Sequence, residues 1–237
     1  MPRWSEAEAR SVGHSATTPR LTRALTIRVM VAHAERARLQ RRGMLLEWFT
    51  VTWNVIEAAV AITAGLVASS VALIGFGIDS GIEVVAASAL LWRFTKAGAD
   101  ATEEEHGAAE RRALYIVSAT FFVLAAYIAV EAVTALVTGE EPDTSTVGVV
   151  LALVSLVVMP TLAHAKQKTG RALGSRALEA DAIETWVCAY LSLALLAGVG
   201  LNAAFGWSWA DPVGALAMLP VILWQGWEKL EEARDDD

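Results

Sequence analysis

The chain of 237 residues is 55% hydrophobic and 19% charged, and its formal net charge is -7. Soluble domains are usually about 45–50% apolar and about 25% charged. The composition therefore excludes an ordinary soluble domain and predicts an integral membrane protein.

Six apolar stretches are long enough to cross a bilayer, which takes about 20 mainly apolar residues. The sequence therefore predicts an all-α, polytopic membrane protein. Pro160 in the fourth stretch is compatible with a kinked membrane helix, and Pro212 suits the first turn of the sixth. The predicted spans are 45–66, 71–92, 113–137, 147–165, 177–199 and 210–227.

Lys and Arg residues are confined to alternate connections of the predicted helices. Nine of the 19 precede the first span, four lie between the second and third, four between the fourth and fifth, and two follow the sixth. The positive-inside rule then places both termini in the cytoplasm. We expect a basic cytoplasmic tail (1–42), a six-helix membrane domain (43–228) and a short acidic cytoplasmic tail (229–237).

The two tails allow few further conclusions. Residues 20–42 form either a basic helix on an anionic membrane surface or a solvated tail that only satisfies topology. We expect no cleaved signal peptide and no cytoplasmic domain after the sixth helix.

The single cysteine excludes an intramolecular disulfide. The positive-inside bias and the Ala-, Val- and Arg-rich composition favour a bacterial plasma membrane.

Two pairs of metal-ligand residues lie inside apolar stretches. Asp79 and Glu83 are four residues apart in the second span, and Glu184 and Cys188 are four apart in the fifth, so each pair shares one helix face. An ungapped overlay at an offset of 105 residues places each pair on the other. A carboxylate at mid-membrane costs about 2.5–3.5 kcal/mol on insertion scales, so it is rarely there without a use. The pairs predict one four-ligand site for a divalent cation.

Each pair also has a plainer interpretation. Asp79 could cap a helix or pair with an Arg, but it lies about nine residues into its apolar run, and nearby glycines let helices approach closely. Cys188 alone would be a small hydrophobic residue. Its match to Glu83 in the overlay is what supports a role as a ligand.

Other polar residues allow more than one interpretation. Asn54 and Glu57 share a face of the first span, where Glu57 supports a metal ligand, carries a proton or donates a packing hydrogen bond. Asp181 is either an entry carboxylate or a helix-start residue near the cytoplasmic interface. His106, in an acidic loop, binds a regulatory metal or belongs to a solvated charge run. Lys166 resembles part of an ordinary cytoplasmic helix end.

Three carboxylates and a thiol suit Zn²⁺ and also accept Cd²⁺, Co²⁺ or Fe²⁺, whereas Mg²⁺ and Ca²⁺ prefer more oxygen ligands. Such ligands bind metal only when deprotonated, so binding releases protons. A transporter with this site would exchange metal for protons. No G-x-x-x-x-G-K-[ST] phosphate loop is present, which argues against an ATP-driven pump.

Over about 45–228 the chain resembles the cation diffusion facilitator family. Ser70-Val-Ala-Leu through Asp79 and Glu83 resembles family helix two, Ala180-Asp181 through Glu184 and Cys188 resembles helix five, and Trp209-Ala-Asp211-Pro212 resembles the start of helix six. The resemblance places the transport site at these two pairs. It also implies a homodimer, here joined through membrane helices.

The chain departs from the family pattern at several points. Glu184 replaces the usual His or Asp of helix five, and Cys188 replaces its final Asp. We expect the chain to lack the His-rich loop of many zinc-transporting members and the C-terminal cytoplasmic domain, as the short members of the family do.

We therefore expect a transporter, not an enzyme, that exports a divalent transition-metal ion from the cytoplasm by proton antiport. Zn²⁺ is the favoured ion, with Cd²⁺, Co²⁺, Fe²⁺ or Mn²⁺ as alternatives. The expected partners are metal ions, protons, the bilayer and a second copy, without a tightly bound cofactor or nucleic acid. The alternative is a non-transporting, metal-binding membrane sensor or scaffold.

Overall fold

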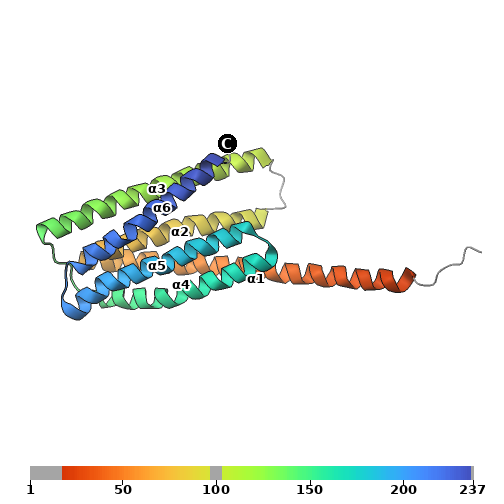
Figure 1. Cartoon of the computed structure of the whole chain (residues 1–237), viewed down its shortest axis with the longest axis horizontal. Coiled ribbons are helices and arrows are strands. Elements are labelled where there is room, and N and C mark those ends of the chain that lie inside the picture. The colour runs from red at the N-terminus through yellow and green to blue at the C-terminus, as the bar shows by residue number, and fades with distance from the viewer. Residues whose placement is uncertain (1–17, 97–102, 236–237) are drawn as a thin grey trace, which may run out of the picture. The chain divides into compact units, whose positions relative to one another are not determined.

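The computed structural model of the chain describes residues 18–96 and 103–235, and every regular element in these ranges is a helix (Figure 1). The prediction of an all-α fold is confirmed. The helices are α1 (Thr18–Ala68), α2 (Val71–Lys96), α3 (Glu103–Thr138), α4 (Thr146–Leu173), α5 (Arg176–Phe205) and α6 (Ala210–Asp235).

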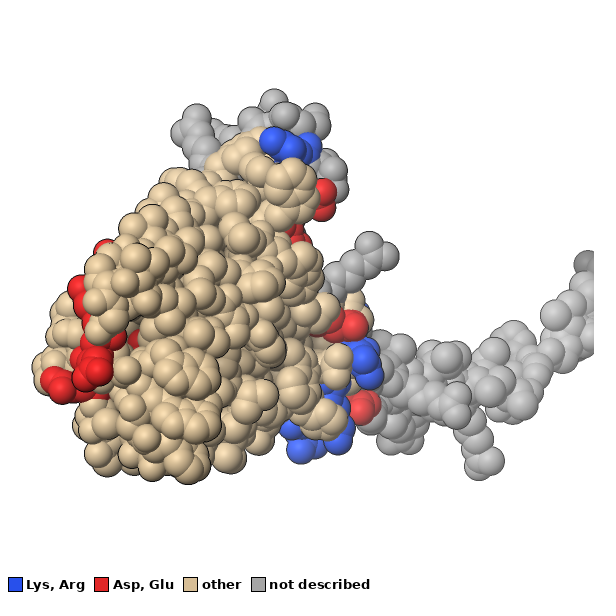
Figure 2. Space-filling model, turned by 60° about the vertical axis from the view of Figure 1, so that its left-hand side comes forward, with Lys and Arg blue, Asp and Glu red and all other residues tan. Residues whose placement is uncertain are grey.

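Five of the described helices, α1 to α5, are long and apolar enough to cross a membrane. The sixth predicted span falls on α6, where Asp211, two prolines and Gln225 interrupt the apolar run, and its place in the membrane stays a prediction. Many large apolar side chains face outwards, among them Val67, Val123 and Val137. Figure 2 shows a broad face without charged side chains, with charged residues gathered at its ends. An exposed apolar surface of this kind suits contact with lipid.

α1 begins at Thr18 and is much longer than the first predicted span, because the basic segment before that span is also helical. The chain divides into two compact units, Met1–Arg41 and Arg42–Asp237. All the candidate metal ligands lie in the second unit.

The helices of the second unit pack around an apolar core that includes Phe76, Ile128 and Met218. α4 lies along α5, and α3 lies along α6 (Figure 1). α1 and α2 approach closely at Gly65 and Gly77. A methyl group added at either position would meet a backbone nitrogen of the other helix at 2.9 Å. Small residues therefore let α1 and α2 pack closely.

Asp211 links α6 to the start of α2. Its carboxylate accepts hydrogen bonds from the Ser70 hydroxyl and, at 3.3 Å, from the backbone N–H of Ala72. Ser70 in turn accepts from the backbone N–H of Leu73 at 3.1 Å. The free N–H groups at the start of α2 are thus partly satisfied from another helix. The motif that resembles the start of helix six therefore also positions the ligand-bearing helix α2.

Candidate metal centre

Asp79 and Glu83 of α2 meet Cys188 of α5 in the interior. All three residues are buried, and each offers a ligand atom that lies within 4.8 Å of those of the other two. Asp79 and Glu83 lie on one face of α2 because they are one turn apart. The Cys188 thiol is brought in from the opposite helix, with its Sγ 4.0 Å from Asp79 Oδ2.

The group and the neighbouring Asn54 contain buried oxygen atoms that no described hydrogen-bond donor contacts. Among the described residues, Asp79 Oδ1 and Glu83 Oε1 have no hydrogen-bond partner, and neither has the amide oxygen of Asn54 on α1. The amide nitrogen of Asn54 donates to Glu83 Oε2 at 2.6 Å. Buried acceptors normally have a hydrogen-bond donor. A cation between these oxygen atoms would take the place of the donors that the described side chains do not provide.

The charge of the group leads to the same conclusion. Within the described residues, the ion pairs of the interior involve other carboxylates, and neither Asp79 nor Glu83 forms a salt bridge with Lys or Arg. Two ionised carboxylates beside a thiol would repel one another strongly in an apolar interior. Either protons or a bound cation must therefore neutralise them.

Glu184, the remaining residue of the predicted quartet, lies outside this group. Its carboxylate forms a salt bridge with Lys229 of α6, and its side chain is 21% exposed. Glu184 is one helical turn from Cys188, so it lies at the edge of the centre. The overlay of the two pairs could not reveal this partner, because Lys229 comes from a third helix.

Glu57 belongs to a separate group of hydrogen-bonded polar side chains. It is fully buried and accepts hydrogen bonds from Trp53 at 3.3 Å, from Ser80 at 2.9 Å and from Ser155. The donors come from α1, α2 and α4. Because the indole N–H of Trp53 can only donate, Glu57 acts as an acceptor in this arrangement. Its use as a proton carrier stays a prediction.

Asp181 forms a salt bridge with Lys166 of α4. The interpretation of Lys166 as part of an ordinary helix end was wrong, because its side chain is fully buried. Its Nζ also lies 3.4 Å from Glu47 Oε2 on α1, a residue that the sequence analysis did not single out. The spacing of charges along each helix carries no signal for this cluster, since its three members come from three helices.

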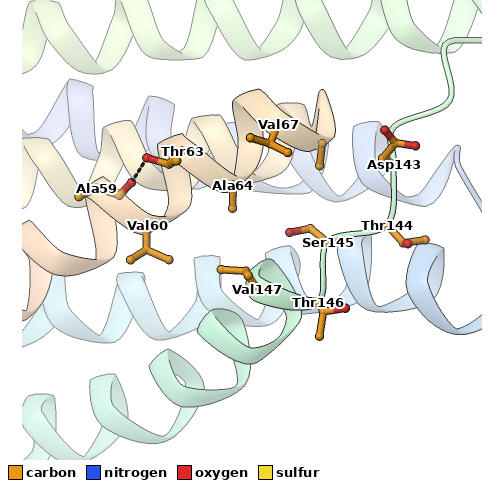
Figure 3. Close-up of a pocket in the computed structure, with 11 residues that line it drawn as sticks. Ala59, Val60, Thr63, Ala64, Val67, Asp143, Thr144, Ser145, Thr146 and Val147 are labelled. Atoms are coloured by element: carbon orange, nitrogen blue, oxygen red, sulfur yellow. Dashed lines mark hydrogen bonds between the residues drawn. The ribbon is translucent and has the colours of Figure 1, made fainter.

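A surface pocket lies apart from the centre. An open pocket of about 870 Å³ runs between α1 and the segment before α4, and its lining includes Val60, Thr63 and Ser145 (Figure 3). The metal-ligand group contributes no residue to it, so the candidate centre is a buried cluster rather than this pocket. The side chain of His106 falls outside the described part of the structure.

Comparison with known proteins places these residues in context. Residues 48–236 match the family model of the cation efflux transmembrane domain. The uncharacterized transporter sll1263 of Synechocystis sp. is 30% identical over 186 residues, which are 75% of this chain and 60% of that protein. Transmembrane protein 163 of Xenopus laevis is 24% identical over 162 residues, which are 68% of this chain and 56% of that protein. The chain thus spans less than two thirds of the length of either relative.

Proposed function

Since this chain belongs to the cation efflux family, a family of metal-cation transporters, we propose that it exports a divalent transition-metal ion from the cytoplasm in exchange for protons. The observation that carries the proposal is the buried group of Asp79, Glu83 and Cys188, whose ligand atoms lie within 4.8 Å of one another. The unpartnered oxygens of this group are the second support. The bound ion is the cargo, so the centre must release it as well as hold it.

The donor set suits Zn²⁺ and ranks Mn²⁺ below the other candidate ions. Ligand atoms that share one Zn²⁺ at bond lengths of about 2.0–2.3 Å lie about 3–4 Å apart. Shifts of about an ångström would therefore close this group around an ion. A thiolate ligand favours Zn²⁺, Cd²⁺, Co²⁺ and Fe²⁺, whereas Mn²⁺ prefers oxygen ligands and ranks below them.

We further propose that Glu184 completes the site as its fourth ligand. To do so it must leave Lys229, so the lysine competes with the ion for the same carboxylate. The Asn54 amide oxygen offers a second way to complete the coordination, because it is buried without a partner beside Glu83. Substitutions at the two positions distinguish these possibilities.

Proton exchange follows from the chemistry of the same ligands. Carboxylates and a thiol bind metal in their deprotonated forms, so binding displaces protons and release allows protons to return. Within the described residues, no ammonium or guanidinium group neutralises Asp79 or Glu83. Protons and metal ions are therefore alternative occupants of one centre, which is the requirement for antiport.

The proposal includes a homodimer joined through membrane helices and a bacterial plasma membrane as its location. The family resemblance supports the dimer, and the cyanobacterial relative is consistent with the location. The exposed apolar faces of the helices suit both lipid and a second copy. Native mass spectrometry of the detergent-purified chain tests the dimer directly.

The decisive experiment measures metal and proton fluxes in proteoliposomes that contain a pH-sensitive dye and the full chain. Zn²⁺, Cd²⁺, Co²⁺, Fe²⁺, Mn²⁺ and Mg²⁺ are compared for the wild type, Asp79→Asn and the control Glu131→Gln, which alters an exposed carboxylate of α3. The proposal expects Zn²⁺ flux with counter-moving protons, lost only in Asp79→Asn. Metal binding without flux would favour the sensor or scaffold, and flux unaffected by Asp79→Asn would contradict the proposed centre.

A further inference from the structure

Lys166 lies in the interior between two carboxylates from other helices. Its ammonium group, on α4, forms a salt bridge with Asp181 of α5 and lies 3.4 Å from Glu47 Oε2 of α1. Neither Lys166 nor Glu47 has exposed side-chain area, and Asp181 is 12% exposed. A charged group is costly in such surroundings, so this cluster needs a reason beyond surface solvation.

The cluster of Lys166, Glu47 and Asp181 lies on the same faces of α1 and α5 as the candidate metal centre. Glu47 precedes Asn54 by seven residues on α1, and Asp181 precedes Cys188 by seven residues on α5. Seven residues are about two helical turns, or about 10 Å, so the members of each pair lie on the same face. The lysine cluster is therefore displaced from the centre towards the end of the bundle where α4 joins α5.

Hydroxyl groups lie between the two levels. Thr50 of α1 and Thr185 of α5 are both buried, and each falls between a cluster residue and a residue of the centre. Each hydroxyl donates to a carbonyl of its own helix, Thr50 to Leu46 and Thr185 to Asp181. Their oxygen atoms provide polar lining between the cluster and the centre.

With both carboxylates ionised, the cluster would carry one more negative than positive charge. Two carboxylates face one ammonium group, and Glu47 Oε1 is buried without a hydrogen-bond partner in the described part of the chain. One carboxylate would be enough to balance the charge of one lysine. The second carboxylate and its unpartnered oxygen fit a cation with a higher charge than the ammonium group.

We propose that Glu47 and Asp181 form a second cation-binding position, which Lys166 occupies as a tethered cation and which a divalent metal ion takes when the lysine withdraws. The claim that this position lies on the ion's route to or from the metal centre rests on the proposed function. The claim that it binds a cation rests only on the geometry of the cluster. In the arrangement described, Lys166 closes this side of the centre to other cations.

The first test counts bound Zn²⁺ per chain at equilibrium, by dialysis and elemental analysis of the full chain in detergent. Lys166→Met removes the tethered cation, and we expect one more Zn²⁺ per chain than in the wild type. The additional ion should be lost in the double variant Lys166→Met/Asp181→Asn. The control Lys168→Met removes an exposed lysine of the same helix and should bind as the wild type does. A folded Lys166→Met chain with wild-type stoichiometry would overturn the proposal.

A second test uses the wild-type chain, so it does not depend on how well the variant folds. An amine-reactive reagent is applied over a range of Zn²⁺ concentrations, and labelling of Lys166 is measured by mass spectrometry. We expect labelling to rise several-fold at Zn²⁺ concentrations above those that fill the metal centre. Labelling that stays constant throughout that range would show that no ion replaces the lysine.

Both tests distinguish this inference from the proposed transport activity, because neither needs a gradient or a vesicle. If Lys166→Met binds an additional Zn²⁺ but the wild-type chain shows no metal flux in proteoliposomes, only the transport proposal is contradicted. If the wild-type chain shows flux, Lys166→Met binds no additional ion and the labelling of Lys166 stays constant, only the second cation position is contradicted.

Discussion

Asn54 donates an amide hydrogen to Glu83 across the α1–α2 contact at 2.6 Å, while its own amide oxygen is buried with no partner among the described residues. The side chain therefore orients one carboxylate of the candidate centre and adds an oxygen to its edge. Groups that orient metal ligands typically contribute about 10–100-fold to metal affinity.

Replacing Asn54 by Leu, which has the same number of side-chain heavy atoms and the same branching, should weaken Zn²⁺ binding by about 10–100-fold. The physical reason is that Glu83 loses its donor and the centre loses a nearby oxygen. Isothermal titration of the purified chain measures the change. Thr52→Val alters an exposed residue of the same helix and is the control. Equal affinities for Asn54→Leu and Thr52→Val would show that Asn54 takes no part in binding.

The thiol of Cys188 should determine which ions the centre prefers. Cys188→Asp replaces a soft ligand by a hard one, so we expect the preference for Cd²⁺ over Mn²⁺ to fall by about tenfold or more. Competition between the two ions in equilibrium binding gives the ratio. Ser192→Ala, one turn further along α5, is the matched control. An unchanged ratio in Cys188→Asp would mean that the thiol does not contact the ion.

The pairing of Glu184 with Lys229 makes the lysine a competitor of the metal ion. Lys229→Met should free the carboxylate and tighten Zn²⁺ binding by about tenfold, because a charge-assisted hydrogen bond contributes about 1.5–3 kcal/mol. Glu184→Gln should weaken binding instead. Binding constants are compared with those of Glu231→Gln, which changes an exposed residue of α6.

The opposite results would reassign the fourth ligand. Should both Lys229→Met and Glu184→Gln bind Zn²⁺ as the wild type does, Glu184 has only a structural role. A large loss in Asn54→Leu would then identify the Asn54 oxygen as the group that completes the site.

The carboxylate of Asp211 stabilises the start of α2 from α6. Asp211→Ala removes this cap and should cost about 1–2 kcal/mol of folding stability, as other cap deletions do. Thermal unfolding in detergent measures the loss, and Asp143→Ala, at an exposed loop carboxylate, is the control. A melting temperature equal to that of the control would show that the contact does not stabilise the protein.

The helical character of the chain and the position of Asp79 and Glu83 on one face were predictable from the sequence. Both depend on local properties, namely the length of the apolar runs and the helical repeat. Five of the six predicted spans correspond to helices that are apolar enough to cross a membrane. The sixth lies on a helix but is less apolar, because Asp211 and Gln225 interrupt it.

The tertiary structure alone decided which side chains meet. Cys188 reaches Asp79 and Glu83, whereas Glu184, one turn away on the same helix, reaches Lys229 instead. Likewise Lys166, at what reads as a polar helix end, lies fully buried between two carboxylates. A sequence determines the spacing of side chains along a helix. The rotation of that helix and the identity of its neighbours depend on how all the helices pack, as at the Gly65 and Gly77 contacts of α1 with α2.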